Sequence, residues 1–239
     1  MGAKKPIYKR VVVKLSGEAL QGGRGHGLDP ALSGYIAGEI KEIQQLGIQV
    51  SIVIGGGNII RGLQAHAGEM ERTVADYMGM LGTVINGLAL QDALERAGVR
   101  ARVMSAIVIG VVVEPFVRRA AVQHLEKGRV VIFVGGTGNP YFSTDSAAAL
   151  RASEIGADAV LKATKVDGIY SDDPVKNPDA VLFEEITYME ALQKNLRVMD
   201  ATAFAMCREN RIPIRVFNMS VPGNFRKAVL GEKIGTLVH

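Results

Sequence analysis

The residues best suited to chemistry lie in a glycine-rich loop, GGTGNPYFSTD at 135–145, between an apolar run and a predicted helix. Its glycines let the backbone approach a bound group and direct N–H donors at it. Helix starts are also favourable positions for anions. A second apolar run follows and ends in Lys162-Ala163-Thr164-Lys165, which places an ammonium group at a strand end. The segment therefore predicts a cradle for a phosphorylated ligand with a lysine beside it.

Two other turns combine glycine with positive charge. Lys14 ends an apolar run before Gly17, where it either binds phosphate oxygens or extends its ammonium group to solvent. Gly55–Gly57 precede Arg61 by about one helical turn, and arginine can hold a phosphate through two hydrogen bonds. The alternative for this turn is close packing of a strand against a helix with an exposed arginine. Glycines alone are weak evidence, but Arg61 beside them favours a ligand.

Two carboxylates are candidates for positioning. Asp145 follows Ser143 and Thr144, either of which can cap a helix, so it either stabilises the helix start or pairs with Lys14 and Lys162. Asp76 lies in a long predicted helix and is either a solvated carboxylate or, if that helix faces the site, an acceptor for ribose hydroxyls. Thr137 and Asn139 offer donors and acceptors suited to the edge of a base.

Several classes of site are excluded by the sequence. It contains neither GxxxxGK[ST] nor a GxGxxG after a strand, so a P-loop enzyme and a Rossmann dehydrogenase are not expected. Four scattered histidines suggest neither a catalytic triad nor a zinc site, and the single cysteine, Cys207, forms no internal disulfide. A net charge of +4 without a lysine-rich tail suits small anionic ligands rather than nucleic acid. We expect no protein-built metal site, no membrane segment and a cytoplasmic location.

Strand-like and helix-like runs alternate along the chain. One predicted helix begins at Asp29-Pro30 and ends at Gly47, and a long one covers 71–97. Pro115 opens another predicted helix, which ends at Gly128. Thr187 with Glu190 matches a capping box. The stretch 167–184 is the most loop-like and is a candidate surface flap. The predicted strands are Arg10–Leu15, Ile48–Ile54, Arg100–Ser105, Val130–Val134, Ala159–Lys162 and Pro213–Asn218.

This β-α-β-α order predicts an α/β fold, a three-layer αβα sandwich with a mainly parallel central sheet. With 239 residues and 48% hydrophobic composition, the chain can bury a full core. We expect a single domain over 1–239 with two halves, about 1–135 and about 136–239. In such sheets ligands bind at the carboxyl ends of the strands, where the candidate residues lie.

Long motifs at these positions resemble those of the bacterial uridylate (UMP) kinases of the amino-acid-kinase fold family. The resemblance runs nearly end to end and includes KLSGEAL at 14–20, VIGGGNIIRG at 53–62, DYMGMLGTVINGLALQDAL at 76–94 and GTGNPYFSTD at 136–145. It continues with LKATKVDGIYSDDP at 161–174, IRVFNM at 214–219 and GEKIGTLV at 231–238. It implies phosphorylation of UMP to UDP by ATP, in pyrimidine nucleotide biosynthesis. It also implies that the half at about 1–135 is the UMP- and phosphate-binding lobe and that the half at about 136–239 is the ATP-binding lobe.

The resemblance also implies roles for individual residues. Lys14 and Lys162 would be the catalytic cations, oriented by Asp145. ATP would contact Lys14, Leu15, Ser16, Gly17, Gly57, Arg61, Thr164, Tyr170 and Asp173. UMP would contact Gly56, Asp76, Thr137, Gly138, Asn139, Pro140, Tyr141, Phe142, Ser143 and Thr144. A loop linked to allosteric activation by GTP would comprise Gly22, Gly23, Arg24, Gly25, His26 and Gly27.

Members of this family are usually hexamers that GTP activates and UTP inhibits, with Mg²⁺ held mainly by the nucleotide phosphates. Two alternatives stay open at this point. One is another kinase of the same fold that acts on a carboxylate or carbamate. The other is a non-catalytic, nucleotide-binding regulator, which the set of Lys14, Arg61, Asp145 and Lys162 disfavours.

Overall fold

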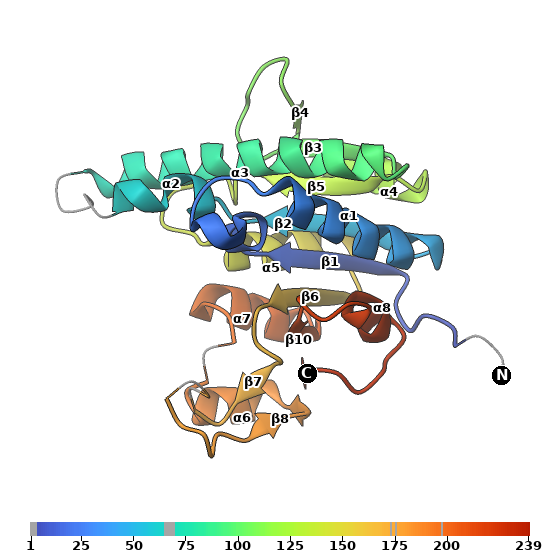
Figure 1. Ribbon diagram of the computed structural model, residues 1–239, viewed down its shortest axis with the longest axis vertical. Coiled ribbons are helices and arrows are strands. Elements are labelled where there is room, and N and C mark those ends of the chain that lie inside the picture. The colour runs from blue at the N-terminus through green and yellow to red at the C-terminus, as the bar shows by residue number, and fades with distance from the viewer. Residues whose placement is uncertain (1–3, 65–69, 173, 175, 197) are drawn as a thin grey trace.

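The computed structural model describes residues 4–239 except 65–69, 173, 175 and 197; the side chains of residues 24 and 61–64 also lie outside the description. Its centre is a nine-stranded sheet in the order β4-β3-β5-β2-β1-β6-β10-β11-β9, which runs from top to bottom in Figure 1. All neighbouring strands pair in parallel except β10 and β11. The strands of this sheet are β1 (Arg10–Leu15), β2 (Gln49–Ile54), β3 (Ala101–Ser105), β4 (Glu114–Pro115), β5 (Val130–Val134), β6 (Ala159–Thr164), β9 (Glu185–Ile186), β10 (Ile214–Asn218) and β11 (Thr236–Val238).

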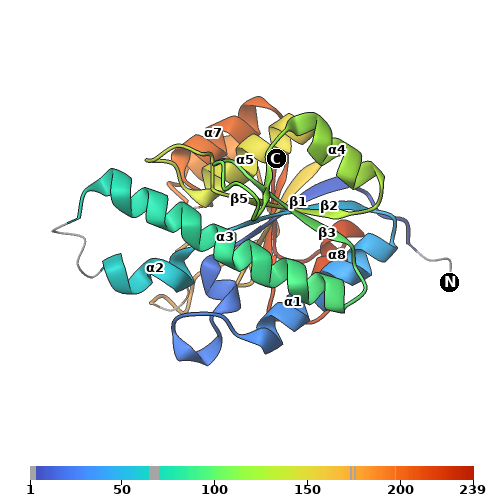
Figure 2. The same cartoon turned by 90° about the horizontal axis from the view of Figure 1, so that it is seen from above.

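Helices cover both faces of the sheet, as the view from above shows (Figure 2). One face carries α1 (Pro30–Gln45), α3 (Arg72–Arg96) and α8 (Asn224–Val229). The other carries α4 (Arg118–Glu126), α5 (Thr144–Ile155) and α7 (Ala201–Glu209). The remaining elements are α2 (Gly57–Gln64), α6 (Tyr188–Gln193), the short 3-10 helices η1 (Gly17–Leu20) and η2 (Gly22–Arg24), and a ribbon of β7 (Ile169–Tyr170) and β8 (Leu182–Phe183). The expected three-layer αβα architecture is confirmed.

Two hydrophobic cores form because successive strand residues point to opposite faces. In β1, Val11, Val13 and Leu15 pack with α1, α3 and α8, whereas Val12 packs with α5 and α7. Burial on both faces explains why the strand sequences are continuous Val/Ile runs rather than alternating ones. The apolar run of β1 therefore suits a central strand, and β1 lies between β2 and β6. Its last residues, Lys14 and Leu15, lie at the carboxyl edge of the sheet.

The six predicted strands and the predicted caps are confirmed. Asp29 accepts a hydrogen bond from the Ala31 N–H group at the start of α1, and Thr187 with Glu190 forms the predicted capping box of α6. The prediction that Pro115 opens a helix is wrong. Pro115 lies in β4, paired with Ser105 of β3, and α4 begins only at Arg118. An edge strand tolerates proline because the missing N–H group has no neighbouring strand to serve.

The stretch 167–184 is not wholly irregular, since it contains the β7–β8 ribbon. The division into two halves stays a prediction. The strands of 1–135 occupy one side of the sheet, from β4 to β1, and those of 136–239 occupy the other, from β6 to β9. In the part of the chain that the structure describes, no helix has both the length and the apolar character needed to cross a bilayer.

Candidate functional site

Lys14 and Lys162 lie side by side at the carboxyl edge of the sheet. They are direct register partners on the neighbouring strands β1 and β6, so their side chains leave the same face of the sheet. Asp145, in the first turn of α5, lies between the two ammonium groups. Its Oδ1 is 2.6 Å from Lys14 Nζ, and its Oδ2 is 2.9 Å from Lys162 Nζ. The three side chains are only 11%, 17% and 14% exposed for Lys14, Lys162 and Asp145 respectively.

The charges in this cluster shift its ionisation. Burial acts to raise the pKa of Asp145, but the positive charges of Lys14 and Lys162 outweigh it and hold that pKa below its usual value. Burial lowers the pKa of Lys162, and the Asp145 carboxylate only partly offsets this. The Val198 carbonyl also accepts a hydrogen bond from Lys162 Nζ at 2.5 Å. The result is a pair of positioned cations with one carboxylate, suited to a highly charged anion.

The glycines of the neighbouring turns bring backbone into contact with backbone. A Cβ atom on Gly17 would lie 2.7 Å from the Gly57 nitrogen, and one on Gly56 would lie 2.5 Å from the Gly79 carbonyl oxygen. The turn after β1, the turn after β2 and α3 therefore meet where a side chain does not fit. Among the described residues, a Cβ on Gly57 would meet no atom within 4 Å, because Gly57 faces a cavity. These two glycine turns are called the cradle below, because exposed amide groups of such turns are of the kind that can bind phosphate.

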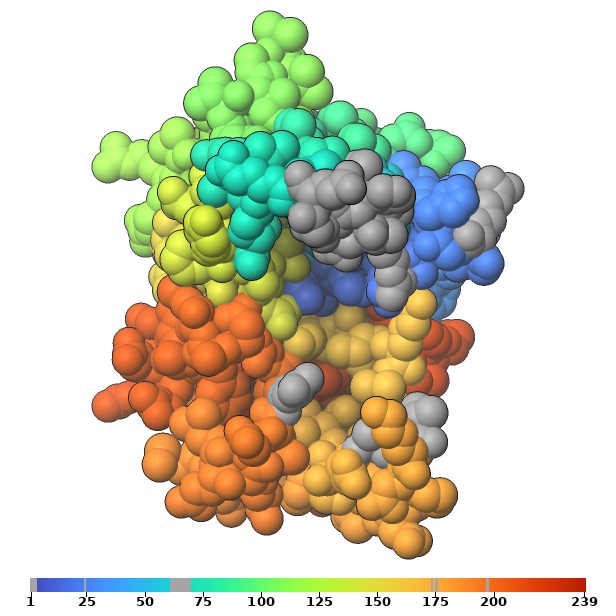
Figure 3. Space-filling model, turned by 90° about the vertical axis from the view of Figure 1, so that its left-hand side faces the viewer, coloured from blue at the N-terminus to red at the C-terminus, as the bar shows by residue number. Residues whose placement is uncertain are grey.

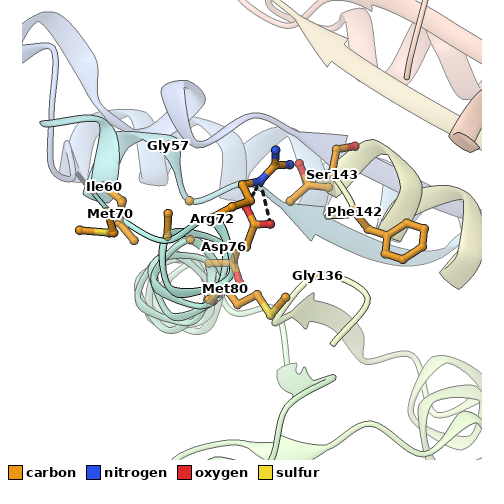
Figure 4. Close-up of a pocket in the computed structure, with 14 residues that line it drawn as sticks. Gly57, Ile60, Met70, Arg72, Asp76, Met80, Gly136, Phe142 and Ser143 are labelled. Atoms are coloured by element: carbon orange, nitrogen blue, oxygen red, sulfur yellow. Dashed lines mark hydrogen bonds and ion pairs between the residues drawn. The ribbon is translucent and has the colours of Figure 1, made fainter. Parts of the chain in front are cut away.

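A first cavity of about 520 Å³ lies beside the cradle, against α3 (Figure 4). Asp76 points into it and forms an ion pair with Arg72 at 3.0 Å. Asp76 also accepts a hydrogen bond of 2.7 Å from the N–H group of Tyr141, so the loop 135–145 is tied to α3. The lining residues are Gly56, Gly57, Ile60, Met70, Arg72, Ala75, Asp76, Gly79, Met80, Thr83, Gly136, Phe142, Ser143 and Thr144.

A second cavity of about 610 Å³ lies on the other side of the lysines. Lys162 forms part of its wall, and the β7–β8 ribbon contributes Tyr170. The described lining residues are Lys162, Thr164, Val166, Gly168, Ile169, Tyr170, Ser171, Asp172, Pro174, Lys194, Asn195, Leu196, Val198 and Val216. Figure 3 looks onto this edge of the molecule and shows a hollow between the teal atoms of α3 and the orange atoms of the C-terminal half.

The two cavities adjoin at the lysine cluster. Thr144 lines the first cavity and is followed directly by Asp145, whose partner Lys162 lines the second. Two bound groups, one in each cavity, would therefore meet beside Lys14 and Lys162. This is the arrangement that a transfer between two ligands requires.

The structure brings most of the predicted site residues to this edge. Gly56, Gly57, Asp76, Phe142, Ser143 and Thr144 line the first cavity, and Thr164 and Tyr170 line the second. Ser16 and Gly17 form the turn after β1, and Leu15 ends that strand in the core. The other residues predicted to contact UMP, Thr137, Gly138, Asn139, Pro140 and Tyr141, form the neighbouring loop and line neither cavity.

Some predicted residues cannot be placed in this site. Asp173 and the side chains of Arg24 and Arg61 lie outside the described residues. The loop Gly22–Gly27 lies apart from both cavities, and its contact with the cradle runs through Asn58, which forms hydrogen bonds with Gly27.

Sequence reasoning missed several residues of the site. Thr83 accepts a hydrogen bond of 2.7 Å from the Gly135 N–H group and so fixes the start of the loop 135–145 against α3. Asp200 accepts hydrogen bonds from Ser143 and Ser146 and caps α7 through Ala203. An aspartate before a helix-forming run predicts the cap of α7, but no local pattern indicates that this carboxylate also reaches α5.

The acidic residues that the structure describes are spread through the site rather than clustered. Among the described residues, no three His, Cys, Asp or Glu side chains lie close enough together to hold a metal ion. The positively charged groups at the centre of the site are those of Lys14 and Lys162, and such groups bind anions.

Comparisons with known proteins identify the family of the chain. The sequence profile of the amino acid kinase family matches residues 9–218. The chain is similar to the UMP kinase of Bacillus anthracis, with 43% identity, a TM-score of 0.94 and coverage of 97% of this chain and 96% of that one. It is also similar to the UMP kinase of Ureaplasma parvum, with 43% identity, a TM-score of 0.91 and coverage of 96% of this chain and 98% of that one. A third similar structure is the uridylate kinase of Archaeoglobus fulgidus, with 29% identity, a TM-score of 0.74 and coverage of 96% of this chain and 99% of that one. The chain therefore belongs to the amino acid kinase family.

Proposed function

We propose that this chain transfers the γ-phosphoryl group of ATP to UMP and so forms ADP and UDP. The observation that carries the proposal is the meeting of two cavities at Lys14, Asp145 and Lys162. The similarity to UMP kinases at 43% identity over nearly the whole chain supports UMP as the acceptor.

The two cavities divide the substrates between them. The first takes UMP, with Asp76 accepting hydrogen bonds from its ribose. By resemblance, Thr137 and Asn139 of the neighbouring loop, which lie outside the cavity lining, contact its uracil. The second takes the adenosine of ATP beside Thr164 and Tyr170, so that its phosphates extend toward Lys14 and the turns after β1 and β2. Arg61 and Asp173 complete the ATP contacts by resemblance.

The chemistry needs position and charge rather than a base. A phosphate oxygen of UMP forms a bond to the γ-phosphorus of ATP while the bond to the bridging oxygen breaks, and ADP leaves with that electron pair. The acceptor phosphate is already ionised, so no proton has to be removed. Lys14 and Lys162 offset the negative charge that develops on the transferred group and the leaving oxygen, and Asp145 keeps both ammonium groups in place.

Mg²⁺ fits this site as an ion carried by the nucleotide phosphates. The described acidic residues supply no cluster of three ligands, and the walls near the phosphates offer lysines and amide groups instead. When bound, the ion neutralises charge on the β- and γ-phosphates.

We further propose a homo-oligomer, a hexamer by resemblance, with GTP as activator and UTP as inhibitor. An exposed apolar stripe on α3 supports self-association: Val74, Tyr77, Leu81 and Ile85 are each 45–49% exposed and repeat at helical spacing. We place the enzyme in the cytoplasm, in pyrimidine nucleotide biosynthesis, with no need for a membrane or nucleic acid.

A coupled ADP-release assay tests the proposal. The purified chain is supplied with ATP, Mg²⁺ and one acceptor at a time: UMP, CMP, glutamate, aspartate, N-acetylglutamate or carbamate, with and without GTP. We expect ADP release with UMP that exceeds every other acceptor, and UDP as the second product. Release with a carboxylate or carbamate but not with UMP would identify a different kinase of this fold. Nucleotide binding without any ADP release would indicate a regulator.

A further inference from the structure

Two buried asparagines form a reciprocal amide pair behind the cradle. Asn58 Nδ2 donates to Asn86 Oδ1 at 3.0 Å, and Asn86 Nδ2 donates to Asn58 Oδ1 at 2.7 Å. The residues are 1% and 0% exposed, respectively. Asn58 lies in the first turn of α2, and Asn86 lies in the middle of α3. Neither lines the two nucleotide cavities, so a direct role in catalysis is not indicated.

The second amide hydrogen of each asparagine is donated to a backbone carbonyl oxygen. Asn86 Nδ2 donates to the Gly55 carbonyl at 2.6 Å, in the turn after β2. Asn58 Nδ2 donates to the Gly27 carbonyl at 2.7 Å, and the Gly27 N–H group donates back to the Asn58 carbonyl at 2.8 Å. All four amide hydrogens of the pair therefore have acceptors, and the pair joins α3, the turn after β2 and the loop Gly22–Gly27.

The pair also touches the turn after β1. A Cβ atom on Gly17 would lie 2.5 Å from Asn58 Oδ1, so the amide group packs directly on that turn. The pair thus contacts both glycine turns of the cradle, the turn after β1 through Asn58 and the turn after β2 through Asn86. Buried amide hydrogen bonds are directional, and a fully satisfied network of this kind specifies one arrangement of the elements that it joins. Two apolar side chains of similar size would fill the space without fixing that arrangement.

We propose that the Asn58–Asn86 pair is a positioning unit for phosphoryl transfer. It holds the two glycine turns in the register that aligns the phosphates, and it transmits the position of the loop Gly22–Gly27 to them. The inference rests on the proposed kinase function, because it assigns the cradle to the transferring phosphates. A pair with a structural role alone would affect stability but not this alignment.

The first test compares Asn58→Leu, Asn86→Leu and the double leucine variant. Each single variant leaves one amide without its partner, so both should lower the melting temperature. The double variant should regain much of this loss. Its kcat should nevertheless stay at least about 10-fold below that of the wild type, since small displacements of reacting groups cost rate steeply. KM for ATP and UMP should change less than about 3-fold, because ribose and base contacts lie elsewhere.

Ser51→Ala is the matched control for this test. Ser51 is fully buried and donates one hydrogen bond, to the Val11 carbonyl, away from the cradle. It should lower the melting temperature without changing kcat. A double leucine variant with wild-type kcat would overturn the positioning role. A wild-type chain without UMP-dependent ADP release would refute the proposed function instead and would be recognised before any variant is compared.

The second test addresses transmission from the loop and uses Asn58→Leu as its only leucine variant, at a temperature at which that variant is folded. Gly27 has φ +77°, and a Cβ there would meet none of the described atoms within 4 Å, so Gly27→Ala disturbs the loop through its backbone. We expect a lower kcat in this variant and no further fall when it is combined with Asn58→Leu. Gly98→Ala, with φ +83° and equally open space at the end of α3, should leave kcat unchanged. Multiplicative effects of Gly27→Ala and Asn58→Leu on kcat would overturn transmission through the pair.

Discussion

Lys162 is the residue whose ionisation should set the basic limit of activity. Its burial lowers its pKa below the usual 10.5, with only partial compensation by Asp145. A loss of the ammonium charge removes one of the two cations that face the transferred group. We therefore expect kcat/KM, which reports the free enzyme, to fall as the pH rises through a value below 10.5. Lys162→Ala should lower kcat by about 10²–10³, as expected for the loss of one positioned donor.

The stability of the fold should change in the opposite direction over the same pH range. Between the lowered pKa of Lys162 and the usual lysine value, the unfolded chain binds more protons than the folded one. The contribution of Lys162 to the free energy of unfolding therefore rises with pH while activity falls. Urea titrations at the pH values of the kinetic profile, for the wild type and Lys162→Met, measure this contribution.

Uracil also loses a proton in alkaline solution, so the fall of kcat/KM at high pH needs a control. Lys162→Arg replaces the ammonium group with a guanidinium group that keeps its charge. If the residual kcat/KM of this variant falls over the same high-pH range, the titrating group is on the substrate and not on Lys162. Lys233→Ala is the control for a general effect of lysine removal, since Lys233 is 87% exposed and pairs only with Glu184 among the described residues.

Asp76 should determine the affinity for the acceptor. It points into the first cavity, where a ribose hydroxyl would find its carboxylate. Asp76→Ala should raise KM for UMP by about 10-fold or more, the loss expected for hydrogen bonds to a charged group, with KM for ATP nearly unchanged. Asp92→Ala is a matched control, because Asp92 lies on the same helix and forms a similar ion pair, with Arg96. Equal UMP kinetics in the two variants would remove Asp76 from the acceptor site.

The sequence predicted the centre of the site better than its surroundings. Lys14, Asp145 and Lys162 could be placed because strand ends and a helix start limit where such side chains lie. Asp76 could not be oriented in advance, since the face that α3 turns to the cavity depends on tertiary packing. Asp200 could be recognised as a cap but not as a partner of Ser143, which is distant in the sequence.

At the scale of elements, Gly56 and Gly57 should respond differently to the same substitution. A Cβ on Gly56 would lie 2.5 Å from the Gly79 carbonyl oxygen, so Gly56→Ala must push α3 away from the turn after β2. Such overpacking typically costs about 1–3 kcal/mol of stability. A Cβ on Gly57 would meet no described atom within 4 Å and would project into the first cavity.

We therefore expect Gly56→Ala to lower both the free energy of unfolding and kcat/KM, and Gly57→Ala to lower kcat/KM alone. Denaturant titration and steady-state kinetics on the same preparations separate the two effects. Equal losses of stability in both variants would contradict the assignment of Gly57 to a ligand surface rather than to packing.

The elements that the sequence predicted are those with a strong local pattern. Apolar runs, several of them continuous in Val and Ile, identified six strands because both faces of those strands are buried. The two-residue strands β4, β7, β8 and β9 and the three-residue β11 carry no such pattern, and they form only because neighbouring strands offer backbone partners. Pro115 misled the prediction because its position is favourable both at a helix start and on an edge strand, and the fold selected the edge strand.

At the scale of the whole molecule, one sheet joins the two halves of the site. The strands β1 and β6 belong to opposite halves, yet they are hydrogen-bonded neighbours that carry Lys14 and Lys162 in register. A motion that separated the halves through the middle of the sheet would break this pairing. The loop 135–145 and the β7–β8 ribbon lie outside this sheet, so a displacement of either would leave the pairing of β1 with β6 intact.

The outer surface of α3 should form an interface between copies of the chain. Its apolar stripe includes Leu81, which is 49% exposed. A charge at its centre would have to be buried without a partner on association, which is strongly unfavourable. We expect Leu81→Asp to lower the molar mass measured by sedimentation equilibrium. Leu192→Asp, at a 47% exposed leucine on α6, should leave the mass unchanged. An unchanged mass for Leu81→Asp, or an equal fall for both variants, would place the interface elsewhere.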